Sequence, residues 1–220
     1  MPTRKLYDDE LKELSDALIK MGTMATDAVS RAMKALKTLD KGLAHEIIED
    51  DANINSMERN IETMCLKLIL KQQPVATDLR KISTAIKMIT DIERIGDAAS
   101  DIAELSLYHD TFSFYEIQND VLEMAESAKK MVISAIDAYV AGDLTLAEKT
   151  IADDDIVDGF FLKIRNDLAS NIYTDAKEMD TVIDYLMIIK YLERIGDHAV
   201  NICEWVQFYV TGIHHNERII

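Results

Sequence analysis

The sequence predicts an all-α protein made of two similar three-helix bundles in tandem, with six long helices. Three observations support this prediction. The 220-residue chain contains 7 Gly and 2 Pro, so turns are few and the elements between them must be long. Its apolar residues recur three or four positions apart, which is the spacing of a helix with one buried face. The word Glu-Arg-Ile-Gly-Asp occurs at residues 93–97 and again at residues 193–197, which indicates an internal duplication.

The first half of the chain is predicted to contain three helices joined by short turns. Apolar residues at helical spacing predict the first helix over residues 6–36, and Asp40-Lys41-Gly42 ends it. A second helix follows over residues 43–70. Residues 72–77 form a turn, and Thr77 or Asp78 is well placed to cap a third helix over residues 79–106.

The second half repeats this order. Residues 108–114 form the expected joint between the halves, and residues 211–220 are expected to be a frayed tail. The repeats are accordingly expected at residues 1–108 and 115–210. The predicted helices of the second half span residues 115–140, 144–172 and 177–209, separated by Ala141-Gly142-Asp143 and by Tyr173-Thr174-Asp175.

Positions around the repeated word also match, which makes the two halves equivalent helix for helix. Gly96 and Gly196 stand inside the third and sixth helices. Glycine costs about 1 kcal/mol against alanine inside a helix, so its presence in both copies indicates that another helix approaches closely there. The alternative is a glycine inherited from the ancestral repeat and tolerated in both copies. The flanks Ile82, Ile86, Ile89, Ile92, Ala99, Ile102 and Glu104 align with Val182, Leu186, Ile189, Leu192, Ala199, Ile202 and Glu204. Likewise Ile48, Asp50, Asp51, Ile54 and Asn55 align with Ile151, Asp153, Asp154, Val157 and Asp158.

Composition limits the possible partners. The 40 acidic against 24 basic residues give a net charge of −16, which disfavours nucleic acid and anionic membrane surfaces and favours cations and basic protein surfaces. No apolar run approaches the ~20 residues of a membrane-spanning helix, and the N-terminus lacks the apolar core of a secretory signal. Cys65 and Cys203 form no CxxC pair and are expected to be buried reduced thiols. These features predict a cytoplasmic protein that does not insert into a membrane.

Each copy of the repeated word opens a stripe of polar residues on one helical face. The members lie three or four residues apart, so they stack along the helix. Neighbouring carboxylates repel one another unless a cation lies between them. The stripes consist of Glu93, Asp97, Asp101 and Glu104 in the first copy and of Glu193, Asp197, Asn201 and Glu204 in the second.

The preceding helix of each half is expected to add further oxygen ligands opposite the stripe. Oxygen ligands from two facing helices form the kind of cluster that binds divalent or trivalent metals. The alternative is a solvated surface, paired in part with Arg94 and Arg194, that binds nothing. The expected pairings place Asp51 and Asn55 opposite Glu93 and Asp97, and Asp154 and Asp158 opposite Glu193 and Asp197.

The main enzymatic alternative is a ferritin-like di-iron carboxylate oxidase or storage protein. Such a site uses Glu-x-x-His pairs, and no His in this chain has Glu three residues before it. His198 follows Asp197, but Ala98 stands at the matching position. We therefore expect His198 to support a ligand by hydrogen bonding or to lie on the surface, and not to coordinate the metal itself. The chain has no G-x-S-x-G word and no Gly-rich phosphate-binding loop. We therefore expect no enzymatic activity.

The chain resembles the PhoU family of phosphate-transport accessory proteins over nearly its full length. The resemblance is most specific in the repeated word followed by His198-Ala199-Val200-Asn201-Ile202, and in the segment at residues 73–80. It implies a non-enzymatic cytoplasmic regulator that represses phosphate-starvation signalling when phosphate is ample. The partners it implies are the ATPase subunit of the phosphate ABC transporter and a phosphate-sensing membrane histidine kinase.

The resemblance also implies multinuclear metal clusters at E(D)xxxD motifs. We expect iron, with manganese, magnesium, calcium or zinc as alternatives, because oxygen ligands dominate. The first half has Ala98 and Asp101 where the second has His198 and Asn201, so the two sites are expected to differ in charge. Long amphipathic helices with surplus apolar residues suggest a homodimer, and a metal-free helical adaptor is a further alternative. Carried over, the ligands are Glu93, Asp97, Asp101, Asp51 and Asn55, and Glu193, Asp197, Asn201, Asp154 and Asp158.

Overall fold

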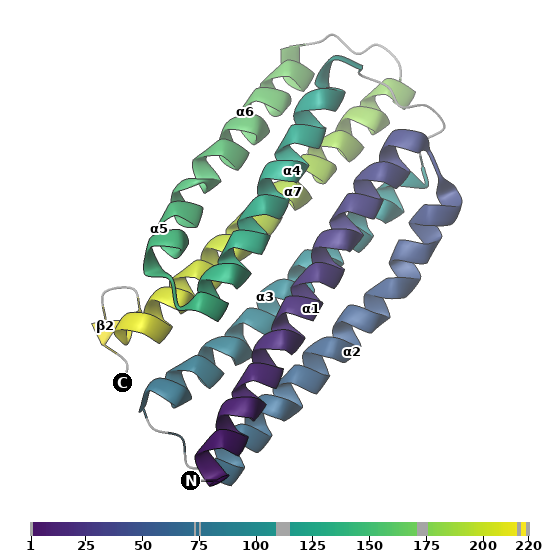
Figure 1. The fold of residues 1–220 in the computed structure, drawn as a ribbon. Coiled ribbons are helices and arrows are strands. Elements are labelled where there is room, and N and C mark those ends of the chain that lie inside the picture. The colour runs from purple at the N-terminus through teal and green to yellow at the C-terminus, as the bar shows by residue number, and fades with distance from the viewer. Residues whose placement is uncertain are drawn as a thin grey trace.

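The computed structural model describes residues 2–72, 74, 76–108, 115–170, 176–214 and 217–218. Over these residues the chain is almost entirely helical, with one short antiparallel pairing near the C-terminus (Figure 1). No described helix combines the length and the hydropathy needed to cross a membrane. The elements are α1 (Pro2–Thr38), α2 (Lys41–Gln72), α3 (Ala76–Ser106), α4 (Tyr115–Ala141), α5 (Leu144–Ala152), α6 (Asp154–Ser170), α7 (Ala176–Thr211), β1 (Ile213–His214) and β2 (Glu217–Arg218).

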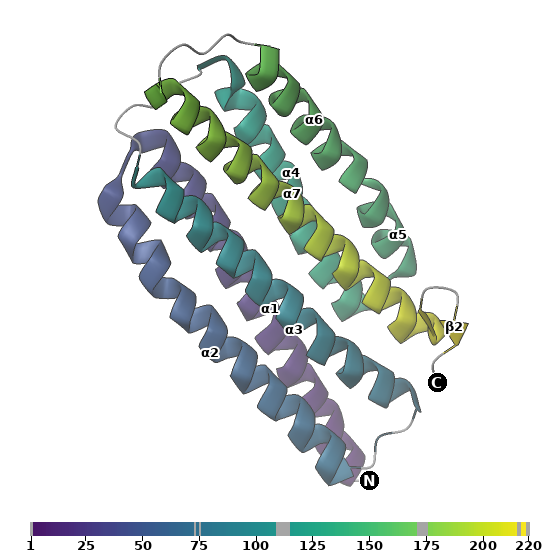
Figure 2. The same ribbon diagram turned by 180° about the vertical axis from the view of Figure 1, so that it is seen from behind.

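The helices form two three-helix bundles that lie side by side (Figure 1). In the first, α1, α2 and α3 pack on one another; in the second, α4 and α7 pack with the α5–α6 pair. Contacts of α1 with α4 and of α3 with α7 join the bundles and leave α2 and α5–α6 at the outer edges (Figure 2). Buried apolar residues of both bundles belong to one connected core, which includes Leu18, Ile89, Tyr139 and Ile189. The predicted all-α architecture of two similar bundles is confirmed.

The turn after the first helix of each bundle uses the same device. Leu39 and Gly142 take positive φ values of 55° and 64°, which turn the chain out of the helix. The next residue then caps the following helix. Asp40 and Asp143 each accept a hydrogen bond at 3.0 Å from the backbone N–H three residues on. These two turns lie where the sequence predicts them.

The predicted fifth helix needs correction. Instead of running unbroken over residues 144–172, it is divided at Asp153 into α5 and α6. Asp153 is the C-cap of α5, and its N–H donates to the Lys149 carbonyl at 3.0 Å. Asp154 and Asp155 then occupy the first turn of α6, where the helix dipole stabilises negative charge. The matching residue Asp50 lies within the unbroken α2, so the two bundles differ here.

Two boundaries also differ from the prediction. Helix α3 begins at Ala76, so Thr77 and Asp78 lie inside its first turn and not ahead of it. The expected frayed tail contains β1, whose residues Ile213 and His214 pair with β2. Residues 109–114 of the expected joint and the turn at residues 173–175 lie outside the described residues.

Gly96 and Gly196 lie where α3 and α7 approach a neighbouring helix, as the repeat predicts. A Cβ added at Gly96 would lie 2.8 Å from Cδ1 of Ile54, and one at Gly196 would lie 2.8 Å from Oδ1 of Asp154. Ile54 belongs to α2 and Asp154 to α6. Each glycine therefore allows a stripe-bearing helix to pack directly against the helix that faces the stripe.

Replacing Gly96 with Ala is expected to lower the free energy of unfolding by about 1–2 kcal/mol, although Ala is the better helix former. The new methyl group would press on Ile54, whose Cγ2 would lie at 3.2 Å. Gly159 in α6 has no heavy atom within 4 Å of an added Cβ, so Gly159→Ala is the matched control and should stabilise by up to about 1 kcal/mol. Urea denaturation measures both signs, and a stabilising Gly96→Ala would contradict the close approach.

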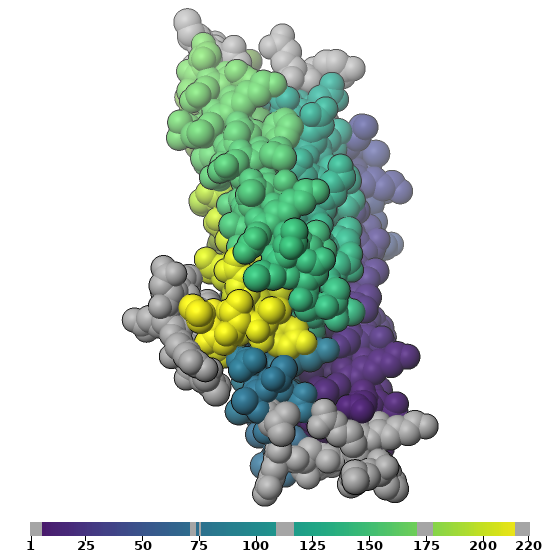
Figure 3. All heavy atoms as spheres, turned by 60° about the vertical axis from the view of Figure 1, so that its left-hand side comes forward, coloured from purple at the N-terminus to yellow at the C-terminus, as the bar shows by residue number. Residues whose placement is uncertain are grey.

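The end of α7 lies on the beginning of α3 (Figure 3). Nε of Arg80 donates to the Tyr209 carbonyl at 3.1 Å, and Oγ1 of Thr84 donates to the Trp205 carbonyl at 3.1 Å. Tyr209 lies in the last turn of α7, where carbonyls lack a helical partner and a cation is favoured. The Lys81 ammonium lies 5.7 Å from the Tyr139 ring centroid, so it also joins α3 to α4. Arg80, from the segment that carries the family resemblance, therefore helps to hold the two bundles together.

Candidate metal centre

The first acid cluster lies between α2 and α3. Asp51 and Asn55 belong to α2, and the Asn55 amide donates to Oδ2 of Asp51 at 2.8 Å. Burial raises the pKa of Asp51, and repulsion from Asp97 and Asp101 of α3 raises it further. Burial, followed by repulsion from Asp97, also raises the pKa of Glu93. The structure therefore brings the predicted ligands of the first half within electrostatic range of one another.

Part of this cluster is neutralised within α3. Nη1 of Arg94 lies 2.9 Å from Oδ2 of Asp97, and its Nε lies 3.4 Å from Oε2 of Glu93. The Arg94 side chain is 53% exposed, so these pairs contribute at most about 1 kcal/mol. Oδ1 of Asp51 and Oδ1 of Asn55 are buried and have no hydrogen-bond partner among the described groups. Two buried acceptors beside mutually repelling carboxylates form an environment that favours a cation.

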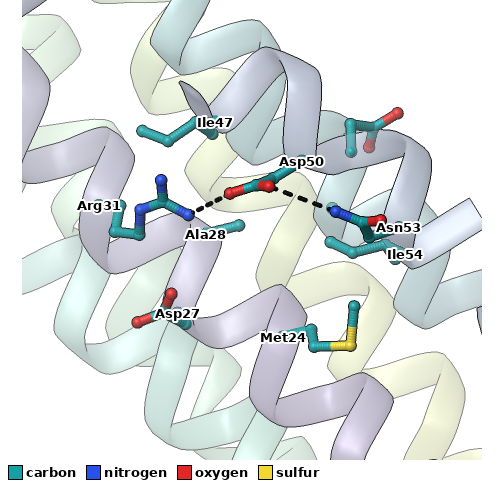
Figure 4. A pocket seen from close by; sticks show the side chains of 10 residues that line it. Met24, Asp27, Ala28, Arg31, Ile47, Asp50, Asn53 and Ile54 are labelled. Atoms are coloured by element: carbon teal, nitrogen blue, oxygen red, sulfur yellow. Dashed lines mark hydrogen bonds and ion pairs between the residues drawn. The ribbon is translucent and has the colours of Figure 1, made fainter. Parts of the chain in front are cut away.

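A pocket of about 200 Å³ opens beside this cluster, between α1 and α2 (Figure 4). Asp51 and Gly96 form part of its wall. Arg31 reaches from α1 to Oδ2 of Asp50 at 2.6 Å and to Oε2 of Glu46 at 3.2 Å. The hydrogen bond to Asp50 raises the pKa of Arg31. Asp51 therefore lies between this pocket and the acids of α3.

The second acid cluster lies between α6 and α7. Burial raises the pKa of Asp154 to about 6, and repulsion from Asp158, Asp197 and Glu193 contributes to the rise. Burial, followed by repulsion from Glu193, raises the pKa of Asp197. Lys190 forms an ion pair with Glu193 and lowers the pKa of Asp197 in part. Four of the predicted ligands, Asp154, Asp158, Glu193 and Asp197, therefore lie in one electrostatic cluster.

The remaining predicted ligands, Asp101 and Asn201, make contacts with the opposite bundle. The Asn201 amide donates to Oδ1 of Asp91 in α3 at 3.2 Å, and Nδ1 of His198 lies 2.8 Å from the same oxygen. From the other side, Tyr191 of α7 donates a hydrogen bond to Asp101. Asp91 of the first repeat thus contacts Asn201 of the second, and Asp101 contacts Tyr191. Asp101 and Asn201 therefore link the acid stripe of each repeat to the other half of the molecule.

Two residues that contact or repel members of the clusters, Glu58 and Asp91, are missing from the sequence prediction. Glu58 of α2 adds to the repulsion that raises the pKa of Glu93, and it follows Asn55 by three residues, so helical spacing was a usable signal. Arg194, expected as a partner of acids on its own surface, lies across the seam from Asp101 and partly offsets the rise that burial causes in the pKa of Asp101. Asp91 lies outside the repeated word and has Tyr191 at the matching position, so no repeat signal marks it.

The donor set suits a hard cation, but the side chains as placed form no coordination shell. Within the described ranges, no three His, Cys, Asp or Glu side chains are arranged to hold one metal ion. The unpartnered oxygens of Asp51 and Asn55 and the raised pKa of Asp154 fit oxygen coordination. Asp51 and Asn55 would supply buried oxygens in the first half, and Asp154 with Asp197 would supply carboxylates in the second. Binding would require rotation of these side chains.

Comparison with known protein families matches the PhoU domain twice, over residues 18–106 and over residues 121–206. The chain belongs to the PhoU family. A relative from Clostridium acetobutylicum, named phosphate-specific transport system accessory protein PhoU homolog, is 37% identical over 211 residues, which are 96% of each chain. The Escherichia coli K12 protein, named phosphate-specific transport system accessory protein PhoU, is 31% identical over 206 residues, covering 94% of this chain and 86% of the relative.

Solved PhoU structures share the whole fold. The crystal structure of PhoU from Pseudomonas aeruginosa superposes with a TM-score of 0.86 at 33% identity, covering 94% of this chain and all of that one. The phosphate transport system regulatory protein PhoU from Streptococcus pneumoniae also gives a TM-score of 0.86, at 27% identity, covering 97% of this chain and 99% of its own. The family resemblance stated from the repeated word is confirmed.

Proposed function

We propose that this PhoU-family protein regulates phosphate uptake and represses phosphate-starvation signalling when phosphate is ample. The observation that carries the proposal is the match of both repeats to relatives named as accessory proteins of phosphate-specific transport. The relatives are named accessory proteins, which favours a regulatory role over an enzymatic one. The proposed location is the cytoplasm, where a transporter ATPase and a kinase domain are accessible.

The proposed mode of action is contact with other proteins. The partners are the ATPase subunit of the phosphate transporter and the phosphate-sensing histidine kinase, and a homodimer is part of the proposal. An exposed apolar stripe on α7 supports protein contact: Met179, Ile183 and Met187 are 45%, 52% and 42% exposed and lie four residues apart. Light scattering at several concentrations, with Ile183→Asp as the variant, tests the homodimer. A concentration-independent monomer would remove it.

Metal binding at the two acid clusters is the second part of the proposal. The support is chemical: buried unpartnered oxygens at Asp51 and Asn55, and carboxylates whose pKa values rise through burial and mutual repulsion. Iron is the first candidate, and manganese, magnesium, calcium and zinc are the others. A cation would neutralise the repulsion and so couple metal binding to the packing of α2 on α3 and of α6 on α7.

Deletion of the gene is expected to abolish phosphate repression of alkaline phosphatase, because the repressor would be missing. Phosphatase activity in phosphate-rich medium measures this directly, and the wild-type gene on a plasmid should restore repression. Complementation with a gene encoding Asp97→Asn and Asp197→Asn together tests whether the clusters contribute. A deletion strain with unchanged repression would remove the proposed function.

Two alternatives make different predictions. A ferritin-like oxidase would consume oxygen when ferrous iron is added, and the regulator proposed here would not. A metal-free helical adaptor would restore repression equally well with and without Asp97 and Asp197. The absence of any Glu-x-x-His pair from the sequence argues against the oxidase.

A further inference from the structure

A second pocket lies on the other seam between the bundles. Along this seam α1 packs against α4 (Figure 1). The two helices approach closely at Gly22, where an added Cβ would overlap Cδ1 of Ile136. Farther along the seam, a groove of about 250 Å³ opens between residues 29–37 of α1 and residues 122–129 of α4. This groove has no part in the acid clusters, which lie on the contacts of α2 with α3 and of α6 with α7.

The floor of this groove is apolar. Val29, Met33 and Ala125 line it and are at most 5% exposed. Leu122 lines it as well and packs against the core from a partly exposed position. An apolar body placed here would be removed from water on one side, at about 25 cal/mol for each Å² of apolar surface buried.

The rim of the groove is cationic. Lys34, Lys37 and Lys129 line it together with a single acid, Glu126. Nζ of Lys129 lies 2.7 Å from Oε1 of Glu126, so this pair is internally neutralised. Lys34 and Lys37 are exposed, and no carboxylate in the described ranges pairs with either. Three lysines against one glutamate give the lining a charge of +2, in a chain whose net charge is −16.

The chemistry of this groove is the reverse of that of the pocket beside Asp51. That pocket contains Asp27, Asp50 and Asp51 against a single cation, Arg31, which already binds two carboxylates. The groove on the α1–α4 seam instead presents Lys34 and Lys37 above an apolar floor, and neither ammonium group has a carboxylate partner among the described residues. Lysine ammonium groups bind oxyanions as flexible point charges.

We propose that the groove binds a small amphiphilic anion. The phosphate or carboxylate head of this ligand lies between Lys34 and Lys37, and its short apolar or aromatic body lies on the floor of the groove. Its volume lies just below the roughly 300–1,000 Å³ of pockets for drug-sized ligands, so the ligand is a small molecule and not a helix of a partner protein. The site adds a ligand-binding function that does not depend on the proposed phosphate regulation.

Titration calorimetry with monooctyl phosphate below its micellar concentration tests the proposal. We expect saturable binding to the wild-type protein at one site. The variant Lys34→Gln/Lys37→Gln should lose at least about tenfold in affinity, because two charge-assisted contacts disappear. The matched control is Lys12→Gln/Lys20→Gln, which removes two exposed lysines of the same helix outside the groove and should retain wild-type affinity.

Two further probes separate the head from the body. Inorganic phosphate alone and octyltrimethylammonium should each bind far more weakly than octyl phosphate, since one lacks the body and the other has the wrong charge. Equal losses in the two double variants would mean that net charge and not the groove drives binding, and would overturn the proposal. So would equal affinity for inorganic phosphate, or an acidic amphipathic peptide that binds where octyl phosphate does not.

Discussion

Replacing Asp154 with Asn is expected to stabilise the metal-free protein at pH 7 by about 1 kcal/mol. Burial, followed by repulsion from Asp158 and Asp197, raises the pKa of Asp154 to about 6, so its ionised form is held at a cost that Asn does not incur. A fully buried carboxylate with this pKa would cost about 3 kcal/mol. Asp154 is partly exposed, so solvent screening reduces the effect.

The sign of the pKa shift sets the pH dependence of this stabilisation. Asp154 has a pKa of about 3.9 in the unfolded chain and about 6 in the folded chain. Between these values the native state binds more protons, so stability falls as the pH rises. The advantage of Asp154→Asn should therefore be absent below about pH 4, grow up to about pH 6 and then stay constant. Urea denaturation across this range measures it, with the exposed Asp16→Asn as control.

In the presence of metal, the wild-type protein should become more stable than Asp154→Asn. A cation held by Asp154 and Asp197 removes the repulsion, and at about 100 times its dissociation constant it stabilises the native state by about 2.7 kcal/mol. Asp154→Asn should lose this gain and bind less metal by elemental analysis after chelator-free purification. If wild-type protein carries no metal and melts identically in EDTA, iron and manganese, the metal proposal is wrong. The stripe would then serve better as a docking surface for a basic partner.

Features that depend on residues close together in the sequence could be predicted. Gly96 and Gly196 mark close helix packing since a mid-helix glycine has a cost that something must offset, and the structure places Ile54 and Asp154 against them. The sequence predicts the chain break at residues 40–42, and the structure adds that Asp40 caps α2, because its side chain reaches the N–H three residues on. Asp51 lies opposite the acid stripe of α3 because neighbouring helices pack antiparallel.

The features that sequence reasoning missed depend on how the two bundles meet. The sequence predicts Asn201 and Asp101 as metal ligands within their own repeats, whereas the structure shows that Asp91 and Tyr191 contact them across the α3–α7 seam. Helical periodicity orders residues on one helix and carries no information on which helix of the other repeat lies opposite. The break at Asp153 also could not be predicted from the sequence, because a single residue with helical φ and ψ ends α5 without any Gly or Pro.

Replacing Asp91 with Ala is expected to lower the free energy of unfolding by about 2–3 kcal/mol. Its side chain is 14% exposed, and Oδ1 contacts both His198, at 2.8 Å, and Asn201, at 3.2 Å. Truncation leaves two polar groups of α7 without their partner at the seam between the bundles. Urea denaturation measures the loss, and Asp16→Ala, an exposed acid on α1, should change stability by less than about 0.5 kcal/mol.

A double-mutant cycle separates the contact from the general effect of truncation. Asp91→Ala and His198→Ala should show a coupling energy of about 1–2 kcal/mol, since each removes the same charge-assisted contact. Tyr191→Phe, which removes the hydrogen bond to Asp101 on the other side of the seam, should instead add to Asp91→Ala, because the two contacts share no partner. Coupling of zero between Asp91 and His198 would mean that their proximity does not stabilise the seam. Strong coupling between Asp91 and Tyr191 would mean that the bundles separate as a unit, so that position 91 of one repeat and position 191 of the other report a single opening of the α3–α7 interface.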